Sequence, residues 1–184
     1  MASLLDPFLS AAGPKIASML GDRFDLDAGQ ARDAVPAVAR PLLDGLRDKL
    51  EAPEQNISTL TTLYQFLSDS DRPTDPGAVS AASKGGMTTK LIEQLTGRNL
   101  GGFAQQVASQ IGVDAGTAQT LVLFVAPKLF AFLRGQTQSQ GFDAVLASVL
   151  GDSGSAKAGA ILKLIRGSDR LGSAMKGLGG LFGK

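Results

Sequence analysis

The chain has no cysteine and no histidine among its 184 residues, and tryptophan is also absent. Without cysteine there are no disulfides, thiolate nucleophiles or cysteine-ligated metal centres. Without histidine the chain lacks the commonest general base and the commonest metal ligand. Catalysis would have to rely on carboxylates, lysine, arginine or Tyr64 alone. We therefore expect no enzymatic activity, no cofactor and no metal site.

Aromatic residues are scarce at 5% of the chain, whereas hydrophobic residues reach 43% and charged residues 19%. This balance is typical of a folded chain rather than a disordered one. A core built mainly from leucine, alanine, valine and isoleucine suits closely packed helices. No stretch shows the period-two alternation of β-branched residues that marks strands. The composition predicts an all-α protein without a β-sheet.

Long hydrophobic runs are missing too. The longest, Leu121 to Pro127, is far shorter than the roughly 20 residues needed to span a bilayer. The first eight residues, Met1 to Phe8, have no basic region of the kind that begins a signal peptide. We expect a cytoplasmic protein.

An internal repeat is the most informative feature that is present. Leu26 to Arg47 aligns without gaps on Val113 to Arg134, with ten identical residues among 22 positions. Just upstream, Ala17 to Gly21 matches Ala108 to Gly112, and Ala147 to Gly151 is a third echo. Repeats of this kind indicate a duplicated structural unit. The pattern predicts a compact multi-helix bundle built from a duplicated helix-turn-helix unit.

The repeated unit carries its own helix boundaries. Gly21, Gly112 and Gly151 stand where a helix should end in the left-handed conformation. Asp27 and Asp114 stand where the next helix needs an acceptor for its free amides. Each unit is therefore predicted to be a short helix, a glycine stop, an aspartate cap and a longer helix.

The two longer helices differ in polarity. The second copy is apolar on several faces and is predicted to be central and buried, whereas the first is amphipathic and should lie at the surface. Pro36, Pro41 and Pro127 fall inside these helices, so kinks or early ends are expected there. Further helices are expected at residues 4–20, 53–67, 88–96, 100–111, 141–150, 155–166 and 168–178. We divide the chain into a first unit (1–75), a second unit packed on it (76–140) and C-terminal helices with a basic, glycine-rich tail (141–184).

Several of these motifs together resemble a known family. They are Pro41 to Leu46, Ser80 to Gly97, Gly112 to Asp114, and Ala126 with Pro127. Over roughly residues 15 to 150 the chain is similar to the bacterial domain of unknown function family 937, which includes YidB-like proteins. The resemblance implies an all-helical bacterial protein with a homeodomain-like arrangement, and it supplies no catalytic residues. Many relatives end in an acidic loop and a glycine-rich tail, whereas the C-terminal end of this chain is basic.

Three local patterns hint at other chemistry without fitting it. The clusters Asp22 to Asp27 and Asp69 to Asp75 lack the ligand spacing of a calcium loop and are interpreted as turns and caps. Gly151 to Lys157 lacks the Gly-Lys-Ser/Thr of a phosphate loop. The second long helix offers only Lys128 to a DNA groove, so DNA is not expected as a partner. A small-molecule substrate is not expected either.

Charge is segregated along the chain although the net charge is only +1. Residues 1–75 hold 7 Lys or Arg against 12 Asp or Glu, and residues 155–184 hold 6 against 1. Apolar residues recur at helical spacing in the basic tail. The predicted interaction residues are Arg166, Arg170, Leu171, Met175, Lys176, Leu178 and Leu181.

These features predict a non-enzymatic protein–protein interaction or self-assembly module whose partner is another protein or a second copy of this chain. A head-to-tail contact between the acidic front and the basic tail would close a ring or propagate a filament. The alternatives are that the tail binds a membrane surface or nucleic acid, or that it closes the core of its own chain.

Overall fold

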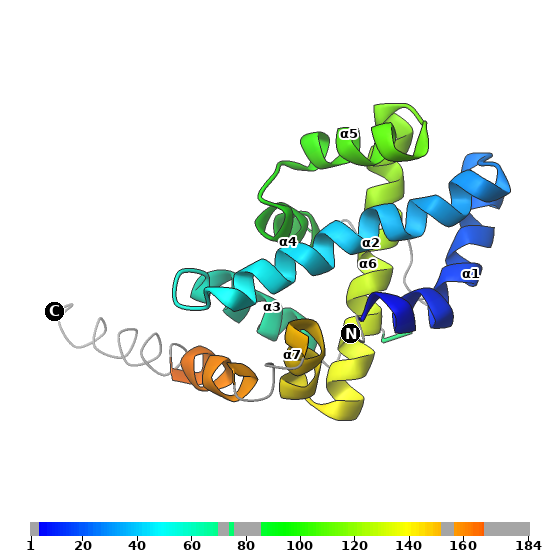
Figure 1. Ribbon diagram of the computed structural model, residues 1–184. Helices are drawn as coiled ribbons and strands as arrows, with labels where there is room; N and C mark the ends of the chain where they lie inside the picture. The colour runs from blue at the N-terminus through cyan, green and yellow to red at the C-terminus, as the bar shows by residue number, and fades with distance from the viewer. Residues whose placement is uncertain (1–3, 70–73, 76–85, 152–156, 168–184) are drawn as a thin grey trace, which may run out of the picture.

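The computed structural model describes residues 4–69, 74–75, 86–151 and 157–167, and the secondary structure in these ranges is entirely helical. This confirms the all-α class predicted from composition. The helices, listed in chain order, are α1 (Leu5–Phe24), α2 (Ala28–Glu51), α3 (Ile57–Ser68), α4 (Gly86–Thr96), α5 (Leu100–Ile111), α6 (Ala115–Gln140), α7 (Phe142–Leu150) and an unlabelled helix at 157–167. Figure 1 shows α2 crossing α6 near the middle of the molecule. The helix predicted at 168–178 lies outside the described residues.

Four of the five predicted caps are confirmed. Asp27 begins α2, and its side chain accepts a hydrogen bond from the Gln30 amide at 2.8 Å. Asp114 begins α6 and accepts from the amides of Gly116 and Thr117. Gly112 ends α5 in the left-handed region with φ 72° and ψ 35°, whereas Gly151 ends α7 with the same φ but with ψ −148°, outside the left-handed helical region. Local hydrogen-bonding chemistry therefore sets these boundaries.

The fifth predicted cap, Gly21, is wrong. Gly21 lies inside α1, which continues to Phe24 and ends at Asp25 in the left-handed region with φ 52°. The extra turn brings the Phe24 ring to 5.8 Å from that of Phe124, in an edge-to-face pair. Burial of this ring favours continuing the helix past a glycine that costs only about 1 kcal/mol relative to alanine.

The early helix ends predicted at the prolines do not occur. Pro36 and Pro41 lie inside α2, and Pro127 lies inside α6, yet both helices run on for at least ten residues. Both also extend beyond the repeat, to Glu51 and Gln140. Tertiary packing of their apolar faces offsets the backbone hydrogen bond that each proline removes.

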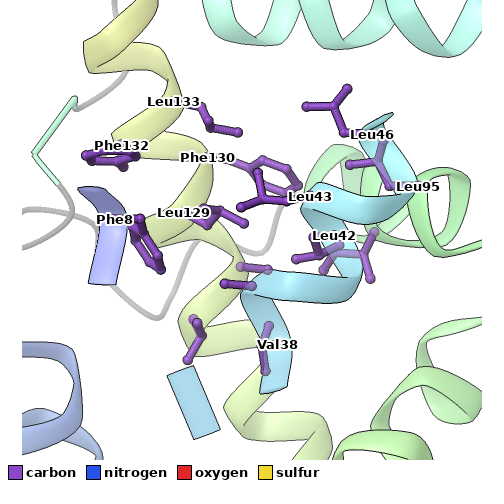
Figure 2. Close-up of a cluster of buried hydrophobic side chains, with 14 of the residues drawn as sticks. Phe8, Val38, Leu42, Leu43, Leu46, Leu95, Leu129, Phe130, Phe132 and Leu133 are labelled. Carbon is purple, nitrogen blue, oxygen red and sulfur yellow. The ribbon is translucent and has the colours of Figure 1, made fainter. Parts of the chain in front are cut away.

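The core lies mainly between α2 and α6. Fourteen residues of α6 between Ala118 and Arg134 are buried, which confirms the prediction of a central helix. In Figure 2, Val38, Leu42 and Leu46 of α2 face the leucines and Phe130 of α6. The charged side of α2 is exposed at Arg32, Asp33, Arg40, Asp44 and Arg47, as predicted for a surface helix.

Both long helices also pack against helices from the other half of the chain. α6 contacts α1 and α3, and α2 contacts α5 and α7. Each of four aromatic pairs joins α1 or α3 to α6 or α7, namely Phe8–Phe132, Phe24–Phe124, Tyr64–Phe142 and Phe66–Phe130, with ring centroids 5.0–5.8 Å apart. The two halves of the chain therefore share one core.

Helix α6 is also the one described helix whose length and composition would allow it to cross a membrane. In the folded chain, however, 72% of its apolar window is buried inside the protein. A core helix of a globular protein meets the same two criteria.

Candidate functional site: the groove between α1 and α2

An open groove of about 910 Å³ runs between α1 and α2, in the part of the molecule where these two helices meet in Figure 1. Its lining residues are small or apolar except for a few polar ones at its edge. They are Leu9, Gly13, Pro14, Ala17, Ser18, Gly21 and Asp22 of α1, Leu26 of the turn, and Ala28, Ala31, Arg32, Val35 and Pro36 of α2. In this groove apolar side chains of α1 and α2 meet solvent.

Small residues on α1 form the floor of the groove. Gly13, Ala17 and Gly21 are spaced four residues apart, so they share one face of the helix. A Cβ added at Gly13 would meet nothing nearer than Leu9 Cβ at 3.8 Å, and one at Gly21 would meet the Leu26 carbonyl at 3.6 Å. The fold itself therefore has room for alanine at both glycines.

Apolar side chains in the groove are only partly covered. Leu9, Ala17, Leu26 and Pro36 are half-buried, whereas Ala31 and Val35 on the α2 side are buried. Burying apolar surface stabilises by roughly 25 cal/mol per Å². The groove can therefore bind an apolar partner through surface that the chain does not cover with its described residues.

Charge near the groove is concentrated at the turn that joins the two helices. Asp22, Asp25 and Asp27 are exposed there. Arg23 points toward α6, because its guanidinium lies 5.8 Å from the centroid of the Phe124 ring. Arg32 lines the α2 side of the groove. The turn is therefore mainly acidic, while the groove itself is lined by one carboxylate, Asp22, and one cation, Arg32.

A hollow at the related position between α5 and α6 has a different chemistry. It is lined by Asn99, Gln105, Gln119 and other polar or small residues, with a volume of about 540 Å³. Amide side chains are well solvated and gain little from being covered by an apolar partner. Of these two hollows, only the one between α1 and α2 has an apolar lining.

The sequence predicts an interaction site in the C-terminal segment, and the structure describes one residue of that site. Arg166 is exposed on helix 157–167, where Lys157 and Lys163 are also exposed. Ala158, Ile161 and Ile165 of the same helix belong to the core. The other predicted residues, Arg170, Leu171, Met175, Lys176, Leu178 and Leu181, lie outside the described residues.

The groove itself was missed by the sequence analysis. The four-residue spacing of Gly13, Ala17 and Gly21 was the available signal, since small residues on one helix face allow close approach of another backbone. The acidic clusters serve as turns where they are described, with Asp27 capping α2 and Asp25 following α1. Within the described ranges, no three acidic side chains are grouped closely enough to hold a metal ion.

Two basic residues of α6 are buried, which the sequence analysis did not anticipate. Lys128 is 1% exposed, and its ammonium lies 4.5 Å from the centroid of the Phe124 ring. Burial lowers the pKa of Lys128, the negative charge of Asp75 acts against this shift, and Lys15 and Arg23 add to it. The signal was a single lysine in an otherwise apolar helix.

The second buried cation is Arg134, which is 3% exposed. Its Nε and Nη2 donate to the Phe66 carbonyl oxygen at 3.3 and 3.1 Å, close to the end of α3. Its guanidinium also lies 4.9 Å from the centroid of the Phe66 ring. Arg134 thus supplies the donor that a terminal helix carbonyl lacks, and we assign it a structural role.

Comparison with known proteins identifies one family. Its description is "Bacterial protein of unknown function (DUF937)", and it matches the chain twice, over residues 6–137 and over residues 93–184. No curated protein and no solved structure matches the chain significantly.

Proposed function

The chain belongs to this family of bacterial proteins of unknown function, as its motifs indicated, and we propose that it acts as a non-enzymatic protein–protein interaction or self-assembly module. The observation that carries the proposal is the open groove between α1 and α2, with its half-buried apolar lining. A surface of this kind binds a partner by burial rather than by chemistry. The chain's lack of histidine and cysteine supports the same proposal.

The architecture that we propose for this module is a duplicated helical unit, with homeodomain-like helix-turn-helix geometry in each copy. Ten identities in 22 positions support it, and so does the displacement between the two family matches. The matches begin at residues 6 and 93, and this is the same displacement that separates Leu26 from Val113. The long helix of each half also packs against helices of the other half: α2 contacts α5 and α7, and α6 contacts α1 and α3. Two related units whose long helices cross would make such contacts.

Solution mass tests the proposal directly. Light scattering coupled to size-exclusion chromatography would be run on the full chain over a wide range of protein concentration, at low and at high salt. We expect a mass that rises with concentration and falls with salt, because screening weakens contacts between an acidic front and a basic end. A single-chain mass under every condition would leave only a different protein as the partner.

Charge-reversed variants identify the surface involved. Lys163→Glu with Arg166→Glu alters two exposed cations on helix 157–167, and Lys90→Glu with Arg98→Glu makes the same change in charge on other exposed positions. We expect the first pair to reduce association and the second to leave it nearly unchanged. Equal effects of the two pairs would mean that only net charge matters.

A second candidate function is binding of an anionic membrane surface or nucleic acid through the basic C-terminal end. It is favoured by the exposed Lys157, Lys163 and Arg166 on a helix that carries no acidic residue. Co-sedimentation with vesicles of anionic lipid, and retention of duplex DNA, would test it at physiological salt. Binding that the Lys163→Glu and Arg166→Glu changes abolish would favour this candidate over self-assembly.

A further inference from the structure

We propose that the groove between α1 and α2 binds residues 168–184 of a second copy of this chain, so that the molecules assemble head to tail. This inference rests on the proposed self-assembly function and names the two surfaces that meet. The groove lies between described residues and has a volume of about 910 Å³. The segment that enters it is identified by its sequence, by its charge and by where it begins.

The segment has the pattern that helix-binding grooves recognise. Leu171, Met175 and Leu178 are spaced at i, i+4 and i+7, which places them on one face of a helix. Helices that dock in grooves use this set of anchors. The groove offers a complementary apolar lining at the half-buried Leu9, Leu26 and Pro36.

The floor of the groove is shaped for close approach. Gly13 and Gly21 are helix-interior glycines that could be alanine without a steric clash, since the nearest atoms to an added Cβ are 3.8 and 3.6 Å away. Each glycine costs about 1 kcal/mol of helix stability relative to alanine. The fold alone does not require glycine at these positions. Glycine there would allow the backbone of a bound segment to lie close to α1.

Charge orients the segment in the groove. Arg170, Lys176 and Lys184 make the segment basic, with Asp169 as its one acidic residue. The α1–α2 turn exposes Asp22, Asp25 and Asp27, of which Asp22 lines the groove, together with Arg32 on the α2 side. Opposite charges at the ends of two surfaces steer association and set its direction.

A helical segment anchored at Leu171 favours the groove of another molecule, because little chain separates this anchor from helix 157–167. Helix 157–167 and the α1–α2 turn lie at opposite ends of the molecule in Figure 1. Helix α2 alone, with 24 residues, is about 36 Å long. Only residues 168–170 separate helix 157–167 from Leu171, and three residues span at most about 11 Å. Each copy would therefore fill its neighbour's groove, which gives a reciprocal pair, a larger ring or an open filament, depending on the rotation between neighbours.

Two full-length variants test this arrangement. Ala17→Lys fills the centre of the groove with a long side chain of the same charge as the segment. Leu171→Asp with Leu178→Asp removes the apolar anchors. Ala11→Lys is the matched control, because it adds the same side chain at an exposed position of the same helix, outside the groove. Circular dichroism would establish that each variant keeps the native helix content.

The expected results are specific to a head-to-tail contact. Each blocked variant alone should remain a single chain at concentrations where the native protein and Ala11→Lys assemble, which corresponds to a loss of affinity of about tenfold or more. An equimolar mixture of the two blocked variants retains one intact groove and one intact segment. It should form a pair with the mass of two chains and grow no further.

A second variant keeps the test decisive if Ala17→Lys unfolds. Gly13→Ala with Gly21→Ala should raise the unfolding temperature and still weaken assembly, because it favours helix formation while raising the groove floor. Assembly that persists in the groove variants would overturn this inference and leave self-assembly through another surface standing. A native protein that stays a single chain at all concentrations would overturn both.

Discussion

Helices α2 and α6 share ten of 22 aligned residues, yet α2 keeps a charged face exposed whereas α6 is buried on nearly all sides between Leu121 and Arg134. Two aligned positions show how this arises. Ala37 of α2 corresponds to Phe124 of α6, and Leu43 corresponds to Phe130. Both phenylalanines pack against aromatic rings of α1 or α3, at 5.8 and 5.7 Å between centroids. The larger residues on α6 therefore fill space between α6 and the helices α1 and α3 that the aligned residues of α2 do not fill.

The same residue can have opposite environments in the two helices. Arg47 and Arg134 are aligned, but the side chain of Arg47 is 53% exposed and pairs with Glu51 at 3.2 Å. Arg134 is buried and bonded to the Phe66 carbonyl oxygen. Local sequence therefore determines that a helix forms and where it begins, whereas its neighbours determine which residues are buried.

Among substitutions at aligned positions of α2 and α6, we expect the largest loss of stability at Phe130. Phe130→Ala removes a buried ring and its edge-to-face partner Phe66, which should lower the free energy of unfolding by about 3–5 kcal/mol. Leu43→Ala at the aligned position of α2 should cost about 2 kcal/mol. Urea titrations followed by circular dichroism would measure both. A loss at Leu43 equal to that at Phe130 would contradict the central role of α6.

Gly45 provides the next test, because the aligned residue in α6 is Phe132. A Cβ at Gly45 would overlap the carbonyl oxygen of Leu95 in α4. Gly45→Ala should therefore destabilise by about 3 kcal/mol, although alanine is the better helix former. Gly159→Ala is the matched control, since nothing lies within 4 Å of its added Cβ, and it should stabilise by up to about 1 kcal/mol. A neutral Gly45→Ala would show that α4 can move away from α2.

Substituting the aligned arginines sharpens the comparison further. Arg134→Met leaves the Phe66 carbonyl without this donor and should lower the free energy of unfolding by about 2 kcal/mol. Arg47→Met removes a surface ion pair and should cost less than about 1 kcal/mol. Thermal unfolding of both variants in parallel would check the difference. Similar small losses would mean that water replaces Arg134 as a donor.

Sequence reasoning was accurate where structure depends on near neighbours along the chain. The caps at Asp27, Asp114 and Gly112 each follow from hydrogen bonds within four residues, and their prediction was confirmed. The family assignment was confirmed for the same reason, since its motifs are turns and caps. The ends of helices were less accurate because packing extends them, as at Gly21.

The candidate site could not be predicted in the same way. The groove exists because α1 and α2 diverge from the turn that joins them (Figure 1). Its lining residues form no sequence motif that would identify a binding site. The burial of Lys128 and Arg134 depends on α1 and α3, which lie about 60 or more residues earlier in the chain. Amphipathic spacing identified a tail with anchors for a partner, but spacing alone does not locate the surface that accepts them.

The smallest effect expected concerns the N-terminal caps of the two long helices. Asp27 accepts one amide, from Gln30, whereas Asp114 accepts two amides and the hydroxyl of Thr117. The bond from the Thr117 hydroxyl is the main reason that the pKa of Asp114 is lowered from its ordinary value, and backbone amides add to this shift. Because the folded pKa is the lower one, the stabilisation is fully present above the unfolded value of 3.8 and is lost as pH falls through the folded value.

Replacing the charge while keeping the cap isolates this contribution. Asp114→Asn retains an oxygen that can cap α6, so stability at pH 7 should change little, but the decline of stability below about pH 4 should become shallower. Thr117→Val should shift the same decline toward higher pH, because it removes the hydroxyl donor and leaves the aspartate. Gln30 occupies the aligned position in the first unit, so Thr117→Gln would make the second cap resemble the first. Urea midpoints measured at several pH values between 2 and 7 would distinguish these outcomes, and identical pH profiles for all three variants and the native chain would show that the difference between the two caps has no effect on stability.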